Sequence, residues 1–330
     1  MTTLTLLILV VTAALIFDFI NGFHDTANAI ATVVSTGVLR PRTAVLMAAT
    51  FDVVGAFLGT AVAATIGKDL LEPAIVTQPL VLAAIAWNLF TWWFGLPSSS
   101  SHALVGGMVG AGIMHAGVSA VKPAGLEKVV IALVVSPVFG FVAAFFVMIA
   151  TYWAVRGMRP VRINTVFRRL QLVSSGFMAL SHGKADAQKT MGVITMALIS
   201  YGSSWNLDGT FHVPVWVTIA CALAMGLGTA SGGWRIIHTM GSKIFKLRPI
   251  HGFCAETSAA IVLQVAAYFG LPTSTTHCIT SAIMGAGATT RLSAVSWGVT
   301  RRILVAWVLT IPVSALLGAA VYRLVSGLEV

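Results

Sequence analysis

The amino-acid sequence predicts an all-α polytopic membrane protein with ten to twelve transmembrane helices, arranged as two inverted-topology repeats with broken helices at a substrate site. Hydrophobic residues make up 57% of the 330 residues and charged residues 9%, a balance that does not suit the surface of a soluble domain. The mean hydropathy is +0.92, and apolar stretches of about 17 to 25 residues, long enough to cross a bilayer, recur along the chain. One polar motif occurs in both halves of the sequence, which predicts an internal duplication.

Ten crossings can be placed on these apolar stretches. They are expected at residues 3–22, 43–66, 75–94, 102–120, 128–155, 171–202, 213–233, 255–271, 278–290 and 301–324. The first has no basic residues before it and no clear cleavage site after it, so we interpret it as a helix and not as a signal peptide. The three cysteines have neither metal nor disulfide spacing, so we expect them to be small hydrophobic side chains.

Basic residues predict the orientation. The formal net charge is +10, but the basic residues are spread over short loops, so nucleic acid is not an expected partner. The densest cluster consists of Arg156, Arg159, Arg162, Arg168 and Arg169. Because loops rich in Lys and Arg remain in the cytoplasm, we expect residues 156–169 to be a cytoplasmic linker of a multi-pass protein in the cell membrane. Both termini then face outward.

The repeated motif reads GLPSSSSHALVGG at residues 95–107 and GLPTSTTHCITSA at residues 270–282. When residues 95–112 are aligned with 270–287, eight of 18 positions are identical. We therefore expect a first repeat at residues 1–155 and a second at residues 170–330. Five crossings in each half is an odd number, so the second repeat is expected to be upside down relative to the first. Inverted repeats are typical of secondary transporters, whose substrate site lies near the membrane midplane where the repeats meet.

Each copy of the motif predicts a helix that begins inside the protein, because Pro suits the first turn and Ser or Thr caps the exposed N–H groups. A helix start binds anions through free backbone donors and its positive dipole end. The alternative is a pair of capped turns at the surface. Eight hydroxyl residues are expected at an anion site: Ser98, Ser99, Ser100, Ser101, Thr273, Ser274, Thr275 and Thr276. Ser99, Ser100, Ser274 and Thr275 are the first choices.

Five acidic residues lie in predicted membrane segments: Asp18, Asp25, Asp52, Asp186 and Glu256. A charge at this depth is costly and usually faces a polar cavity or an ion pathway. Asp25 and Asp186 are the strongest candidates, since each lies in a polar run that we expect to interrupt a helix. Carboxylates repel an anion unless they bind a cation, so we expect these two to hold H⁺ or Na⁺. For Asp18, Asp52 and Glu256, a hydrogen bond between helices is an equally good interpretation.

Further polar residues complete the candidate site. Asn28 and Lys189 are expected to add donors to the anion. The possible accessory residues are His24, His102, His182, His277 and Glu256. The histidines suit either proton transfer or a hydrogen bond to a neighbouring helix. Beyond the coupling cation, no cofactor is expected, and Na⁺ is the one metal ion considered.

At these residues the sequence resembles the inorganic phosphate transporter (Pit) family, in its short bacterial and archaeal form. NGFHDTANAIATVVST resembles the first signature of that family, HGKADAQKTMG the second, and LPSSSSH with LPTSTTH the paired hydroxyl and histidine elements. The resemblance covers nearly the whole chain. It implies a homodimeric symporter that imports inorganic phosphate with H⁺ or Na⁺. On the matching positions, Asp25, Asn28 and Asp186 would bind ion and substrate, and Ser98 to Ser101 with Thr273 to Thr276 would bind phosphate.

One departure from the family pattern concerns the second signature. Ala185 stands where Asn usually precedes the Asp, and Lys184 stands before it. The missing side-chain amide leaves the ligand count, the coupling ion and the preference between phosphate and sulfate open.

Other functional classes fit less well. An intramembrane hydrolase is not expected, since the sequence contains neither G-x-S-x-G nor H-E-x-x-H, and we predict that the protein is not an enzyme. A passive anion channel is a weaker alternative, because buried carboxylates beside an anion site hinder the free passage of anions. A sulfate permease of the same family is the nearer alternative.

Overall fold

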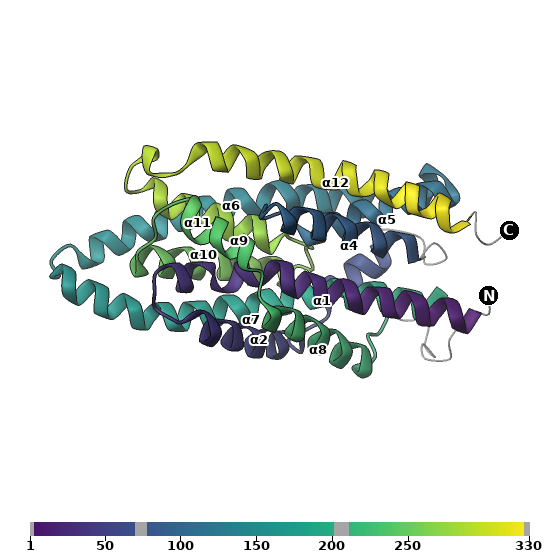
Figure 1. Ribbon diagram of the computed structural model, residues 1–330, viewed down its shortest axis with the longest axis horizontal. Helices are drawn as coiled ribbons and strands as arrows, with labels where there is room; N and C mark the ends of the chain where they lie inside the picture. Colours follow the sequence, from purple (N-terminus) through teal and green to yellow (C-terminus); the bar gives the residue numbers. More distant parts are fainter. Residues whose placement is uncertain (1–2, 70–77, 201–210, 327–330) are drawn as a thin grey trace.

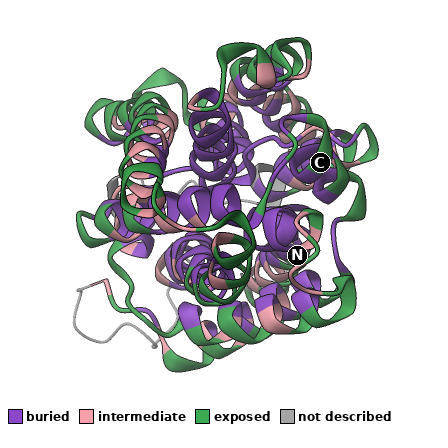
Figure 2. Cartoon of the chain, turned by 90° about the vertical axis from the view of Figure 1, so that its left-hand side faces the viewer, coloured by how far each residue is buried: buried purple, intermediate pink, exposed green. Residues whose placement is uncertain are grey.

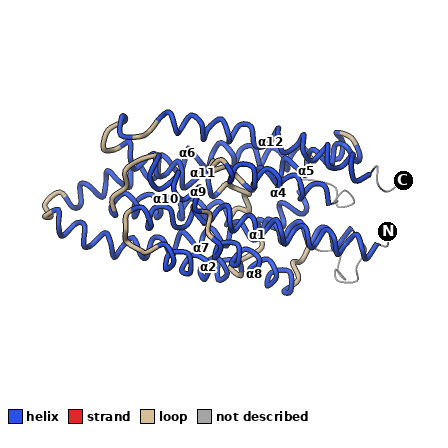
Figure 3. The backbone as a smooth tube through the Cα atoms, viewed as in Figure 1, coloured by secondary structure: helices blue, strands red, loops and turns tan. Residues whose placement is uncertain are grey.

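The structure is a computed structural model that describes residues 3–69, 78–200 and 211–326. In these ranges the chain is helical and contains no β-strand (Figure 3), as the sequence predicts. The helices are α1 (Thr3–Ser35), α2 (Pro41–Ala56), α3 (Ala61–Ala64), η1 (Thr65–Asp69), α4 (Gln78–Trp93), α5 (Ser100–Ala116), η3 (Val118–Ala120), α6 (Pro123–Val155), α7 (Pro160–Ser200), α8 (Val215–Ser231), α9 (Trp234–His238), η4 (Thr239–Lys243), α10 (Pro249–Tyr268), α11 (Thr275–Ala288), η5 (Leu292–Ala294) and α12 (Trp297–Ser326).

By length and composition, four helices are able to cross a membrane: α1, α6, α10 and α12. Two bent pairs reach that length together, α2 with Ala61–Gly67 and α8 with Trp234–Lys243, with bends of 66° and 60°. The described residues thus contain four to six candidate spans, and the expected count of ten to twelve is not confirmed. The expected crossings at 75–94 and 171–202 extend into residues 75–77 and 201–202, which lie outside the described residues.

The expected helix breaks at Asp25 and Asp186 are wrong. α1 continues to Ser35 and α7 continues from Pro160 to Ser200, so both acids lie inside uninterrupted helices. The physical reason is that side chains of other helices form hydrogen bonds with the polar side chains of these segments. The backbone can therefore keep its helical hydrogen bonds. Most of the expected linker is also helical, because α7 begins at Pro160, where proline suits the first turn of a helix.

The helices pack in reciprocal pairs. α1 packs on α8 and α2 on α7, whereas α5 packs on α12 and α6 on α11. The two termini lie at one end of the bundle, and the turn between α6 and α7 lies at the opposite end (Figure 1). Viewed along the bundle, buried residues occupy its interior and exposed residues its rim (Figure 2).

Glycines allow close contact where the two acid-bearing helices cross their partners. A Cβ on Gly22 of α1 would lie 2.2 Å from the carbonyl oxygen of Met225 on α8, and a Cβ on Gly183 of α7 would lie 2.2 Å from that of Asp52 on α2. Real side chains do not approach so closely, so only glycine fits at these crossings. Each glycine precedes an acid by three residues, Asp25 and Asp186 respectively, and is therefore on the same face of its helix.

Candidate functional site

Two helices begin in the interior of the protein, at the hydroxyl motifs. α5 starts at Ser100 and α11 at Thr275, and both first residues are buried. The side chains of Ser99 and Ser274 are the N-caps, and their oxygens accept a hydrogen bond from the backbone N–H of His102 and His277, at 3.2 Å in each case. The motifs thus form capped helix starts, as expected.

Asp25 of α1 lies at both helix starts. Its Oδ2 accepts a hydrogen bond from the hydroxyl of Ser100 at 3.2 Å, and its Oδ1 accepts one from the hydroxyl of Thr276 at 3.3 Å. The same Oδ1 lies 2.6 Å from Nδ1 of His24. One turn along α1, the amide of Asn28 donates to the hydroxyls of Thr275 at 3.2 Å and Thr276 at 2.9 Å. One face of α1 therefore contacts the beginning of α5 and of α11.

Asp186 of α7 makes a similar set of contacts. Its Oδ2 accepts a hydrogen bond from the hydroxyl of Thr275 at 3.2 Å. Its Oδ1 accepts one from Nζ of Lys189, and the same ammonium group donates to the hydroxyl of Ser101 on α5. Lys189 is 2% exposed, and it is the one buried Lys or Arg among the side chains that the structure describes. The second acid-bearing helix therefore also contacts both helix starts.

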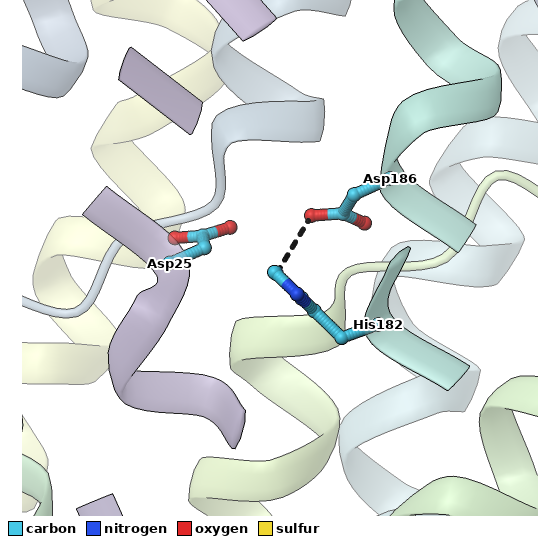
Figure 4. A group of neighbouring side chains, drawn as sticks. All are labelled: Asp25, His182 and Asp186. Atoms are coloured by element: carbon cyan, nitrogen blue, oxygen red, sulfur yellow. Dashed lines mark ion pairs between the residues drawn. The ribbon is translucent and has the colours of Figure 1, made fainter. Parts of the chain in front are cut away.

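The two carboxylates and His182 form a small polar centre (Figure 4). Asp25, His182 and Asp186 are buried, and a ligand atom from each lies within 4.8 Å of the others. Nε2 of His182 is 3.5 Å from Oδ2 of Asp186, and its Nδ1 is 2.9 Å from Oδ1 of Asp52 on α2. Carboxylate oxygens beside an imidazole suit either a cation or a proton at this centre.

The other sequence-predicted histidines fall into two places. Nε2 of His24 lies 3.1 Å from the hydroxyl of Thr91 on α4. The rings of His102 and His277 lie 4.8 Å apart, between α5 and α11, and His277 also stacks on Trp307 at 3.9 Å. Within the described residues, neither ring nitrogen of His102 or His277 has a hydrogen-bond partner. Both histidines lie in the first turn of their helices. In the described part of the chain, neither ring forms a hydrogen bond with Asp25 or Asp186.

Ser98 and Thr273 precede the two caps. The hydroxyl of Ser98 donates to that of Thr91 at 2.8 Å and lies 3.5 Å from Nε2 of His24. Thr273 is buried, and its backbone N–H donates to the carbonyl of Leu271 at 2.8 Å. Neither residue forms a hydrogen bond with Asp25 or Asp186 in the described part of the chain.

The remaining three acids form interhelical hydrogen bonds. Asp18 accepts from Thr190 at 2.9 Å, and Asp52 accepts from Thr229 at 2.7 Å in addition to its contact with His182. Glu256 lies in a separate buried group, where it accepts hydrogen bonds from Thr32, Gln171 and Ser174. Of these three acids, Asp52 contacts a residue of the polar centre, because it is hydrogen-bonded to His182.

Two polar residues of the site escaped the sequence analysis. Thr91 joins His24 to Ser98, as described above, and its sequence signal is a hydroxyl inside the apolar run NLFTWWFG. Gln188, on α7 between Asp186 and Lys189, accepts a hydrogen bond from the backbone N–H of Val62 at 2.8 Å. Its side chain satisfies a free donor in the first turn of α3, which a local sequence pattern does not reveal.

A cavity opens beyond the site along α1. It has a volume of ≈ 580 Å³ and is lined by Val34 and Ser35 of α1, by His238 of α9 and other residues of α9 and η4, and by Lys246, which follows η4. Val34 and Ser35 follow Asn28 by about two turns. It lies toward the end of α1 that is remote from the N-terminus.

Comparisons with known proteins give consistent results. A family model described as "Phosphate transporter family" matches residues 21–162 and 156–318. The chain is 51% identical over 322 residues to a "Probable low-affinity inorganic phosphate transporter" of Rhizobium meliloti (strain 1021), covering 96% of each chain. It is 47% identical over 325 residues to a protein of the same description from Bacillus subtilis (strain 168), covering 97% of each.

A solved structure is also similar. Its title is "The sodium-dependent phosphate transporter"; the TM-score is 0.87 and the sequence identity 26%, and the match covers 98% of this chain and 99% of that chain. The similarity of fold thus extends over nearly the whole of both proteins.

Proposed function

Because this chain belongs to the phosphate transporter family, we propose that it imports inorganic phosphate across the cell membrane by symport with H⁺ or Na⁺. The family consists of transporters, and the chain is a multi-pass membrane transporter and not an enzyme. The names of the relatives support phosphate rather than sulfate as the substrate.

The observation that carries this proposal is the meeting of two helix starts and two acid-bearing helices at one buried place. The hydroxyls of Ser100, Ser101, Thr275 and Thr276 all form hydrogen bonds with side chains of α1 or α7. Each is a neutral donor beside a positive helix end, which suits phosphate oxygens. Phosphate would bind between α5 and α11, with Asn28 and Lys189 as further donors.

The buried carboxylates support cation coupling. Asp25 and Asp186 are both buried beside this donor set, and two carboxylates in a poorly solvated site repel an anion strongly. A cation or proton bound at Asp25, His182 or Asp186 removes part of that repulsion. Phosphate and the coupling cation would therefore bind together more tightly than either alone, a positive coupling that favours their joint transport.

Ser99 and Ser274 act in this proposal through helix capping. Their oxygens already accept backbone N–H groups, although each hydroxyl still has a proton to donate. Ser98 and Thr273 lie one position further from the helix and would support the donors rather than lead them. In this proposal His24, His102 and His277 lie near the hydroxyl donors and help to hold them in position.

We also propose the inverted-repeat architecture, with a first repeat at residues 1–155 and a second at residues 170–330. The reciprocal packing supports it, since α1 packs on α8 as α7 packs on α2, and α5 on α12 as α11 on α6. In this proposal the α6–α7 turn is cytoplasmic, both termini are outside, and the protein is a homodimer in the membrane.

The test is uptake of radiolabelled phosphate into proteoliposomes that contain the purified protein. Na⁺ and pH gradients are imposed separately, with sulfate as competitor. We expect one of the gradients to drive accumulation above equilibrium, with little competition by sulfate. Uptake that never exceeds equilibrium would contradict symport and favour a passive pathway, and concentration of sulfate in place of phosphate would contradict the substrate.

A further inference from the structure

The two halves of the site make matching contacts but differ in one charge. Asp25 precedes Asn28 by three residues on α1, as Asp186 precedes Lys189 on α7. Asp25 accepts from Ser100 of α5 and Asp186 accepts from Thr275 of α11, at 3.2 Å in both cases.

The second matching contact involves the residue one turn later. Asn28 donates to Thr276, the second residue of α11, and Lys189 donates to Ser101, the second residue of α5. A neutral amide on α1 therefore has its counterpart in an ammonium group on α7.

This difference changes the charge at each carboxylate. Nζ of Lys189 is bonded to Asp186 and to a hydroxyl oxygen, and such oxygen ligands are also those that hard monovalent and divalent cations take from proteins. In the described part of the chain, no Lys or Arg side chain forms an ion pair with Asp25, whose partner is His24. A buried carboxylate that is already paired with a fixed cation binds a mobile cation much more weakly, because its charge is neutralised.

The amide oxygen of Asn28 differs from Lys189 in a second way. It is buried, and within the described residues it accepts no hydrogen bond. An unused oxygen beside a carboxylate is a ligand available to a cation. The α1 half of the site therefore offers oxygen ligands, whereas the α7 half already contains a positive charge.

We propose that Lys189 is a tethered cation that takes, at Asp186, the place of one transported cation, so that the mobile cation is held at Asp25 with the amide oxygen of Asn28 among its ligands. The inference rests on the proposed cation-coupled phosphate transport, and it makes residue 189 a determinant of how many cations accompany each phosphate. The ammonium group neutralises Asp186 in every step of the cycle because it cannot leave the site.

The test replaces Lys189 by the residue found at the matching position of α1. Lys189→Asn removes the tethered charge and supplies an amide oxygen, and Lys189→Met removes the charge without supplying an oxygen. Binding of ²²Na⁺ to the detergent-purified proteins gives the number of ions per chain, and phosphate uptake into proteoliposomes is measured with and without Na⁺.

We expect Lys189→Asn to bind one more Na⁺ per chain than the unchanged protein. Under the ion gradient that drives the unchanged protein, its uptake should fall by at least about tenfold, as for a buried ion pair that has lost one partner, and a higher Na⁺ concentration should restore most of it. Lys189→Met should lose uptake to a similar extent, with little restoration by Na⁺. If Lys189 were only a phosphate ligand or only structural, the two variants would behave alike and Na⁺ would rescue neither.

A reciprocal variant keeps the inference testable if Lys189→Asn does not yield a monodisperse protein. Asn28→Lys places a second tethered cation beside Asp25 and should abolish gradient-driven accumulation while phosphate binding to the purified protein is retained. Unchanged accumulation in Asn28→Lys, or an unchanged Na⁺ count in Lys189→Asn, would overturn the inference. Failure of the unchanged protein to accumulate phosphate under either gradient would instead contradict the proposed function.

Discussion

Asp52 fixes the orientation of His182 across the crossing of α2 and α7. Oδ1 of Asp52 lies 2.9 Å from Nδ1 of His182, which leaves the other ring nitrogen 3.5 Å from Oδ2 of Asp186. A carboxylate that accepts from one ring nitrogen fixes the tautomer and position of an imidazole. Asp52 thus acts on the polar centre through the histidine, and within the described residues it has no hydrogen bond to the helix starts.

The first prediction concerns this positioning. Asp52→Asn keeps the side-chain shape but removes the charge that orients His182, so we expect the rate of phosphate uptake to fall by about tenfold, while the affinity for phosphate changes by less than about threefold. The measurement is the concentration dependence of uptake in proteoliposomes. Glu256→Gln is the matched control, because Glu256 is equally buried but accepts its hydrogen bonds from Thr32, Gln171 and Ser174, which form a separate group. An equal effect of both variants would assign Asp52 a general structural role.

The second prediction concerns coupling. Asp25→Asn should abolish gradient-driven accumulation because its amide binds neither a proton nor a cation as the carboxylate does. Asp186→Asn should abolish it because the buried ammonium group of Lys189 loses its carboxylate partner. Both variants should still insert and remain monodisperse, which size-exclusion chromatography in detergent checks. Retained accumulation in both would remove the proposed role of these carboxylates.

The third prediction separates the structural acid from the coupling acids. Glu256 accepts hydrogen bonds from Thr32, Gln171 and Ser174, so Glu256→Gln places an NH₂ group among three donors. We expect a loss of stability of about 1–3 kcal/mol for the mismatched buried group, visible as a lower Tm in detergent. The ratio of internal to external phosphate at steady state should be unchanged. A normal Tm with lost accumulation would move Glu256 into the transport site.

The fourth prediction distinguishes helix capping from substrate binding within the hydroxyl motif. Ser100→Ala removes a donor beside Asp25 and should weaken phosphate binding by about tenfold, as for a lost hydrogen bond to a charged group. Ser99→Ala removes the N-cap of α5 and should cost about 1 kcal/mol of stability, with a smaller change in affinity. Phosphate titration and thermal unfolding of both variants measure the two effects. The opposite pattern, with affinity lost chiefly in Ser99→Ala, would make the cap residue the principal ligand.

The helix starts could be predicted because their causes are local. Pro97 and Pro272, followed by Ser and Thr, are sufficient to predict α5 and α11 to within a few residues, since proline geometry and N-capping act over one turn. The all-helical fold likewise follows from composition and hydrophobic length.

The continuity of α1 and α7 could not be predicted, because it depends on distant partners. The polar run around Asp25 resembles a helix break in isolation, yet its hydrogen-bond partners Ser100 and Thr276 are 75 and 251 residues away in sequence. The pairing of Lys189 with Ser101 is equally non-local, since the two are 88 residues apart. Sequence spacing identifies such polar residues as candidates but does not indicate which side chains neutralise them.

The last prediction concerns the crossing that carries the Asp52–His182 contact. Gly183 of α7 leaves no room for a side chain, since a Cβ there would lie 2.2 Å from the carbonyl oxygen of Asp52. Gly183→Ala should therefore force α2 and α7 apart and cost about 1–3 kcal/mol of stability, as overpacking does, even though alanine has the higher helix propensity.

Gly298→Ala is the matched control, because Gly298 lies in α12 and a Cβ there would have nothing within 4 Å of it. We expect a lower Tm and slower phosphate uptake in Gly183→Ala, and an unchanged or slightly higher Tm with normal uptake in Gly298→Ala. His182 is adjacent to Gly183. A loss of uptake that exceeds the loss of stability would therefore indicate that the close crossing holds the histidine between Asp52 and Asp186. Parallel losses of uptake and stability would indicate a packing role alone.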